Sequence, residues 1–193
     1  FFDKLLTDMT KRGRKGLEPT HDDVTYTLQA SYNLDPALVD VALMTVRLER
    51  LEKELPQRII GQRFALPQII KAIRNAFSGV NDPEKPRTIV GLFGAPGTGK
   101  TETVKVICEL LGLEMRRFDM TAYQNANDGP KLMEKVYAFS KEFPFGVPFF
   151  DEIEKSHPNV QNSLLVGLDS GIIEAERDSD SGGQKKTTVA TSG

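Results

Sequence analysis

The sequence has little cysteine, little net charge and no long apolar run. Cys108 is the single cysteine among the 193 residues, which excludes an intrachain disulfide and a zinc site built from cysteines. The formal net charge is −2, which argues against broad electrostatic capture of nucleic acid, so we predict no nucleic-acid partner. No stretch approaches the roughly 20 apolar residues of a membrane-spanning helix. We therefore expect no membrane span and a cytoplasmic protein.

The N-terminal part of the chain, residues 1–55, has a helical pattern. Residues 35–55 are expected to form one helix with Asp35 as its N-cap. Val46 and Leu51 belong to the expected apolar stripe of this helix. A coiled coil would need more heptads than this, so we interpret the segment as a packing helix.

In residues 56–193, apolar runs typical of strands alternate with helical patterns. Strands that alternate with helices of about 10–15 residues indicate a parallel sheet covered on both faces. We therefore predict an α/β fold, a three-layer sandwich of a parallel sheet between helices, preceded by the helical N-terminal segment. The strands are expected at 88–93, 114–120, 146–153 and, after a hairpin-like excursion, 185–192; the helices are expected at 62–79, 100–111, 129–143 and 157–171.

A glycine-rich turn follows the first expected strand and fits the pattern G-x-x-x-x-G-K-S/T. Glycines let the backbone curl so that successive N–H groups point inward at phosphate oxygens. The helix start adds its positive dipole end, Lys100 is expected to reach the β- and γ-phosphates, and the Thr101 hydroxyl to ligate Mg²⁺. The sequence therefore predicts a P-loop nucleotide site. Its predicted residues are Gly94, Ala95, Pro96, Gly97, Thr98, Gly99, Lys100, Thr101 and Glu102.

An acidic pair follows the apolar run Val147–Phe150 at the end of another expected strand. Asp151 is placed to hold Mg²⁺ through water, and Glu152 to orient or deprotonate the attacking water. The alternative is a pair of surface acids at the start of the next helix. We favour the catalytic interpretation because the pair ends a strand and follows a phosphate loop. Pro148 is unexpected here, because proline removes a hydrogen-bond donor from a strand that should be central.

Four motifs in order resemble the second ATPase module of the Clp-type AAA+ chaperones, the ClpA and ClpB group. They are "LEKELPQRIIGQ", "GAPGTGKTE", "RRFDMTAY" and "DEIEKSHPNVQNSLLVGLDSGII". The resemblance covers residues 48–193, makes residues 1–55 the helical linker before that module, and implies ATP and Mg²⁺ as cofactors. It implies hexameric rings that thread polypeptide through a pore, and therefore a homo-oligomer with a polypeptide client. The segment implied to line the adenine pocket is Ile59-Ile60-Gly61-Gln62, in which Ile59, Ile60 and Gly61 are the expected contacts.

The chain departs from this family pattern in two places. After the second strand, the family's substrate-gripping loop is missing, and Tyr123 is the one aromatic residue nearby. Either the protein has lost this loop or the sequence as given omits it. Gly193, the last residue given, stands where a sensor asparagine is expected, so we expect the arginine finger and the helical lid to be missing from this stretch of sequence. Because an arginine finger contributes roughly 10³–10⁵ in rate, we expect only weak hydrolysis by this chain alone. We interpret Arg116, Arg117 and Arg177 as ordinary surface or strand arginines.

Three functions are compatible with these residues. The first is a Clp-like ring ATPase that remodels or unfolds proteins by Mg-dependent ATP hydrolysis, which the intact acidic pair favours. The second is an assembly scaffold that binds ATP without threading polypeptide, which the short segment after Met120 favours. The third is a kinase built on a phosphate loop, but no residue pattern suggests the acceptor pocket that it would need.

Overall fold

The computed structural model describes residues 7, 10–11, 29, 35–38, 40–78, 85–170, 172–176 and 186–190. The chain divides into two compact units, Phe1–Val46 and Arg47–Gly193. Most of the first unit, together with Gly79, Arg177 and Gly193, lies outside the described residues, so the expectations for those positions stay predictions.

The first long helix begins later than the sequence predicts. Residues Pro36–Leu38 form a short 3₁₀ turn, η1, in which the Asp35 carboxylate accepts from the Ala37 N–H at 2.9 Å. Helix α3 then spans Val41–Arg58. The prediction of one helix starting at Asp35 is therefore wrong. The Asp40 carboxylate accepts hydrogen bonds from the N–H groups of Ala42 and Leu43, so it caps α3 as a separate helix.

The buried face of α3 agrees with the predicted apolar stripe only in part. Leu48 and Leu51, expected on the stripe, are buried together with Leu55, whereas Val46, also expected on it, is exposed. The helix continues through Leu55 and Pro56, so the predicted domain boundary lies inside α3, and the division into two domains stays a prediction.

Two further helices follow. Helix α4 spans Ala65–Ala76 and buries one face, which consists of Leu66, Ile69, Ile70, Ile73 and Ala76. Helix α5 spans Lys100–Leu111, which confirms the predicted helix, and it ends at Gly112 with φ +69°. That left-handed glycine lets the Leu113 N–H donate to the Cys108 carbonyl at 2.8 Å and close the last turn. No described helix is both long enough and apolar enough to cross a membrane.

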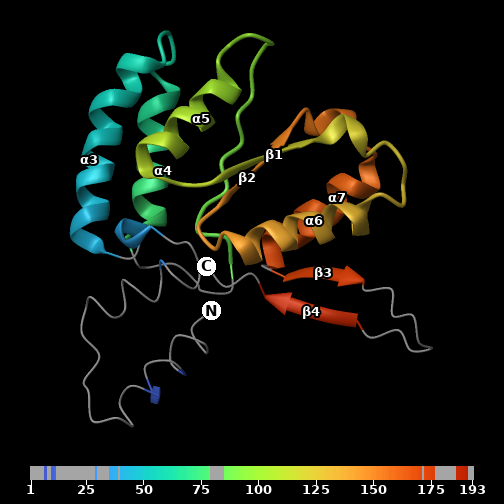
Figure 1. Ribbon diagram of the computed structural model, residues 1–193. Helices are drawn as coiled ribbons and strands as arrows, with labels where there is room; N and C mark the ends of the chain where they lie inside the picture. The colour runs from blue at the N-terminus through green and yellow to red at the C-terminus, as the bar shows by residue number, and fades with distance from the viewer. Residues whose placement is uncertain are drawn as a thin grey trace. The chain divides into compact units, whose positions relative to one another are not determined.

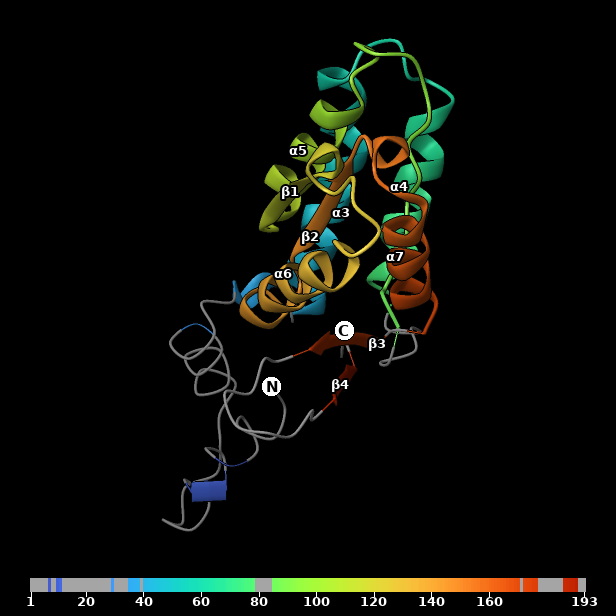
Figure 2. The same ribbon diagram turned by 90° about the vertical axis from the view of Figure 1, so that its right-hand side faces the viewer.

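Two parallel strands lie at the centre of the second unit. Strand β1 (Met115–Asp119) pairs with β2 (Val147–Asp151), and the register places Asp119 opposite Asp151. Helix α5 contacts β2 from one side, and helix α6 (Gly129–Glu142) contacts it from the other, as Figures 1 and 2 show. This arrangement confirms the two predicted strands and an α/β fold with a small parallel sheet.

The first expected strand is not part of this sheet. Residues 88–93 are in no strand, and the side chains of Ile89 and Phe93 are 59% and 95% exposed, so the prediction of a buried strand is wrong. Within the described residues, strand β2 pairs with β1 alone. Because the Val147 N–H donates toward β1, the nitrogen of Pro148 faces the side of β2 that has no partner strand there, so β2 tolerates the proline.

The last expected strand pairs elsewhere. Strands β3 (Ile172–Glu176) and β4 (Lys186–Ala190) form a separate antiparallel pair, with Ile172 opposite Ala190. The hairpin that the sequence indicates is therefore confirmed. Within the described residues β4 does not join β1 and β2, so its expected return to the parallel sheet is wrong.

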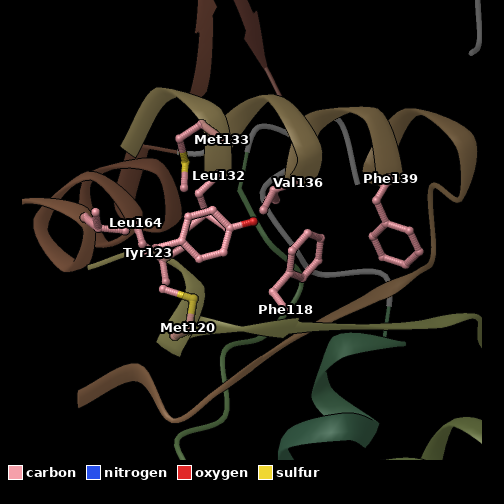
Figure 3. Close-up of a cluster of buried hydrophobic side chains, with 9 residues drawn as sticks. Phe118, Met120, Tyr123, Leu132, Met133, Val136, Phe139 and Leu164 are labelled. Atoms are coloured by element: carbon pink, nitrogen blue, oxygen red, sulfur yellow. The ribbon is translucent and has the colours of Figure 1, made fainter. Parts of the chain in front are cut away.

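The best-packed core lies between α6, α7 (Pro158–Ser170) and the two parallel strands (Figure 3). Phe139 is fully buried there, with its ring 6.4 Å from that of Phe118 and 5.5 Å from that of Phe143. The buried members of this core are Phe118, Met120, Tyr123, Leu132, Met133, Val136, Phe139, Val160 and Leu164.

A pair of phenylalanine substitutions tests this packing. Phe139→Ala should lower the free energy of unfolding by about 3–5 kcal/mol, because it removes a fully buried ring. Phe93→Ala should change it by less than about 0.5 kcal/mol, because that side chain is exposed. Urea denaturation measures both variants. A large loss for Phe93→Ala would mean that residues 88–93 are buried against a neighbour and that the exposed arrangement is incorrect.

Candidate functional site

The glycine-rich turn that precedes α5 is a curl of exposed backbone. Gly97 has φ +77° and Gly99 has φ +84°, conformations that residues with side chains rarely adopt. A Cβ atom built on either glycine would meet nothing within 4 Å, so the backbone angle and not crowding explains these two glycines. The Thr98 hydroxyl donates to the Ala95 carbonyl at 2.9 Å and closes the curl from within.

Lys100 lies at the first position of α5 and folds back over the curl. Its ammonium donates to the carbonyl oxygens of Gly94 at 2.8 Å and Ala95 at 3.0 Å. Thr101 follows it, half-buried, in the first turn of the helix. Helix α5 thus presents its positive end, its unpaired amides and an ammonium group beside an open curl, a chemistry that fits a phosphate-like anion.

The segment between α3 and α4 touches this curl through one side chain. Ile59 is buried, Ile60 is 89% exposed, and Gly61 has φ +89°. Directly after that glycine, the Gln62 side-chain amide donates to the Thr98 carbonyl at 2.9 Å. The resemblance places Gln62 in the segment that lines the adenine pocket, but nothing in the local pattern links its side chain to a turn 36 positions later.

Asp151 ends β2, and both of its carboxylate oxygens have donors. Arg117 Nη2 lies 2.8 Å from Oδ2, and the Glu152 N–H donates to Oδ1 at 3.1 Å. The Asp151 side chain is 18% exposed. Arg117 lies opposite Phe149 in the register, and residues two apart on a strand share a face, so Arg117 can reach Asp151. The interpretation of Arg117 as an ordinary arginine missed this pairing, because only the strand register reveals it.

Glu152 has an exposed side chain and a strained backbone. Its φ of 56° and ψ of 44° are left-handed, and it is the one non-glycine residue with positive φ in the described chain. It leads into the 3₁₀ turn η3, Ile153–Lys155. Such conformations cost about 1–3 kcal/mol and persist where the surrounding structure imposes them, often at functional sites.

A third acid lies near this pair. Asp119, opposite Asp151 in the register, accepts from both the hydroxyl and the backbone N–H of Thr121 at the start of the 3₁₀ turn η2, Met120–Ala122. These hydrogen bonds, the one from the hydroxyl above all, lower the pKa of the Asp119 carboxyl. Two carboxylates therefore end the two parallel strands side by side.

The curl and the acidic pair lie on neighbouring elements, because α5 contacts β2. Among the described interactions, no hydrogen bond or ion pair joins Lys100 or Thr101 to Asp151 or Glu152. The described residues also contain no cluster of three or more His, Cys, Asp or Glu side chains that could hold a metal. Mg²⁺ commonly needs only one or two carboxylates when substrate phosphates supply further oxygens, so this donor set fits a nucleotide-bound Mg²⁺.

Tyr123, the aromatic residue near the position where the gripping loop is expected, belongs to the core. Its side chain is 5% exposed, and Figure 3 shows it among the buried side chains beneath α6. Its hydroxyl accepts from the Lys135 ammonium at 3.3 Å, and its carbonyl accepts from the His157 N–H at 2.9 Å. A side chain held in this way cannot reach out to a polypeptide.

Comparison with known proteins assigns the family. The profile of the AAA domain (Cdc48 subfamily) matches residues 85–192, a range that includes the curl, Lys100 and the acidic pair. The chain belongs to this family. It is therefore related to the AAA ATPases, and the curl, Lys100, Asp151 and Glu152 are its candidate nucleotide site.

Individual relatives are Clp proteins. The chain is 38% identical over 146 residues to the ATP-dependent Clp protease ATP-binding subunit ClpC of Staphylococcus saprophyticus, covering 66% of this chain and 17% of that protein. It is 36% identical over 146 residues to the chaperone protein ClpB of Bacteroides thetaiotaomicron, covering 66% and 16%. It is 33% identical over 182 residues to the negative regulator of genetic competence ClpC/MecB of Bacillus subtilis, covering 84% and 22%. The chain therefore spans less than a quarter of the length of these relatives.

Glycine substitutions test the strained backbone of the acidic pair. Glu152→Gly should leave the free energy of unfolding within about 0.5 kcal/mol of the parent, since relief of roughly 1 kcal/mol of left-handed strain offsets the flexibility of glycine. Glu154→Gly, in the adjacent turn η3, should lower it by about 0.5–1 kcal/mol, because no strain is relieved there. Denaturation curves of the two variants provide the comparison. Equal losses would show that Glu152 is not left-handed in solution.

Proposed function

We propose that this chain binds ATP with Mg²⁺ in the curl at Gly94–Thr101 and hydrolyses it with Asp151 and Glu152. The observation that carries the proposal is the Lys100 ammonium inside a glycine curl at the start of a helix, in a chain of the AAA family. The contact of that helix with the strand that ends in the acidic pair supports it further.

The residues of the curl bind and orient the phosphates. The backbone N–H groups at residues 94–99, apart from Pro96, which has none, donate to phosphate oxygens, and Lys100 exchanges its two carbonyl partners for the β- and γ-phosphate oxygens. Thr101 supplies its hydroxyl to Mg²⁺, and Glu102 lies in the same first turn of α5. Ile59, Ile60 and Gly61 lie on the adenine side, and of these Ile60 and Gly61 are exposed.

The acidic pair handles the metal and the water. Bound Mg²⁺ neutralises the charge that develops on the phosphates. The Asp151 carboxylate, oriented by Arg117, anchors the metal through water. The Glu152 carboxylate, exposed at the left-handed residue that follows the strand, accepts the proton of the attacking water.

For the whole protein we propose a cytoplasmic homo-oligomeric ring, a hexamer, that remodels a polypeptide client. This step rests on the similarity to ClpC and ClpB, of which the chain covers only a part. The same similarity supports a more detailed fold. In this fold, residues 56–193 form a three-layer P-loop sandwich that follows a helical segment in residues 1–55.

One observation favours a second candidate function. This candidate is a scaffold that assembles under the control of ATP and does not thread polypeptide. The chain passes from β1 through the turn η2 to α6, and the Tyr123 side chain on this path is buried. Hydrolysis that is unaffected by polypeptide, with assembly that depends on ATP, would favour this candidate.

The lysine substitution tests nucleotide binding. Lys100→Ala should abolish measurable ATP binding, because each charged hydrogen bond to phosphate that is lost weakens binding by about 10- to 150-fold. Lys105→Ala, on the exposed face of the same helix, removes the same charge and should bind ATP as the parent does. Calorimetric titration with Mg·ATP gives both affinities. Unchanged binding by Lys100→Ala would contradict the site.

The glutamate substitution separates binding from hydrolysis. In the assembled protein, Glu152→Gln should bind ATP normally and release phosphate about 10²- to 10⁴-fold more slowly, because the amide cannot accept the proton of water. Glu154→Gln makes the same change two residues later and should hydrolyse ATP at the parent rate. Phosphate release by Glu152→Gln at the parent rate would remove Glu152 from the mechanism.

A further inference from the structure

The carbonyl oxygens of the curl are held by side chains from three places in the sequence. Lys100 donates to Gly94 and Ala95, the Thr98 hydroxyl also donates to Ala95, and Gln62 donates to Thr98. Of these donors, Gln62 alone comes from outside the curl and its helix. It is therefore the one external hold on the backbone of the curl among the described contacts.

Gln62 is itself fixed by its backbone. Its carbonyl accepts from the N–H groups of Ala65 and Leu66 at 3.1 Å each, at the start of α4. The left-handed Gly61 separates it from the end of α3. At that end, the Arg58 guanidinium makes a two-bond contact with the Glu109 carboxylate of α5, at 2.9 and 2.8 Å. The Gln62 amide thus projects from a point tied to both α4 and α5.

We propose that Gln62 is a positioning residue that turns the Gly99 N–H toward the bound phosphates. The peptide between Thr98 and Gly99 is planar and trans, so its carbonyl and its N–H point in opposite directions. Holding the Thr98 oxygen against Gln62 therefore directs the Gly99 N–H away from Gln62. At a glycine with φ +84° the peptide would otherwise rotate at little cost.

This inference rests on the proposed function, because it assigns a role within the same phosphate site. It differs from the adenine-lining role of the neighbouring Ile59, Ile60 and Gly61. A contact to adenine would change the affinity for ATP alone. A hold on the Gly99 amide changes the affinity for any polyphosphate, with or without a base.

The experiment compares Mg·ATP with Mg·tripolyphosphate by calorimetric titration of the full chain. Gln62→Ala should lower the affinity for both ligands by the same factor, about three- to tenfold, which corresponds to one lost hydrogen bond. Gln62→Glu keeps the shape of the side chain but places an acceptor against the Thr98 carbonyl. It should lower the affinity for both ligands at least as much as Gln62→Ala does. Gln68→Ala is the control, since its amide contacts only the Phe64 carbonyl within α4, and it should bind both as the parent does.

A second measurement needs no ligand. The ¹H–¹⁵N resonance of Gly99 should shift in Gln62→Ala and stay in place in Gln68→Ala, with the thermal melting of each variant recorded to verify folding. The role of Gln62 would be overturned, with the nucleotide site left intact, by either of two results in Gln62→Ala. One is an unchanged Gly99 resonance, and the other is a lower affinity for ATP with an unchanged affinity for tripolyphosphate. Absence of binding by the parent protein would instead overturn the proposed function and this inference together.

Discussion

The candidate site depends on a backbone turn in a left-handed conformation that residues with side chains rarely adopt. Two left-handed glycines, Gly97 and Gly99, give the turn before α5 its curl, and side-chain donors occupy its carbonyl oxygens. Backbone N–H and C=O groups both need partners. The Ala95 and Thr98 carbonyls have the Thr98 hydroxyl and the Gln62 amide as donors apart from Lys100, which leaves the N–H groups of the curl for an anion.

The second half of the site is organised by an ion pair. Arg117 on β1 and the backbone of Glu152 hold the two oxygens of Asp151, so the carboxylate has a fixed orientation at the end of β2. A carboxylate has about four acceptor positions, and these two donors leave room for a metal-bound water. The same chain segment places Glu152 in a left-handed conformation, so positioning and strain occur together at the acidic pair.

Tyr123, on the path from β1 to α6, belongs to the core. That side chain packs with Leu132 and Val136 of α6 and hydrogen-bonds to Lys135, so it stabilises the fold. In β2, Pro148 removes one backbone donor that a second neighbouring strand would use.

The sequence by itself determined the features that depend on neighbouring residues. The glycine curl, the helix at Lys100, its end at Gly112 and the acidic pair after β2 all follow from backbone preferences and apolar periodicity. Only the tertiary structure decided that residues 88–93 lie outside the sheet, that Arg117 holds Asp151 and that Gln62 holds the Thr98 carbonyl. Those contacts join residues tens of positions apart, and such contacts depend on strand register and helix packing, which local sequence patterns do not encode.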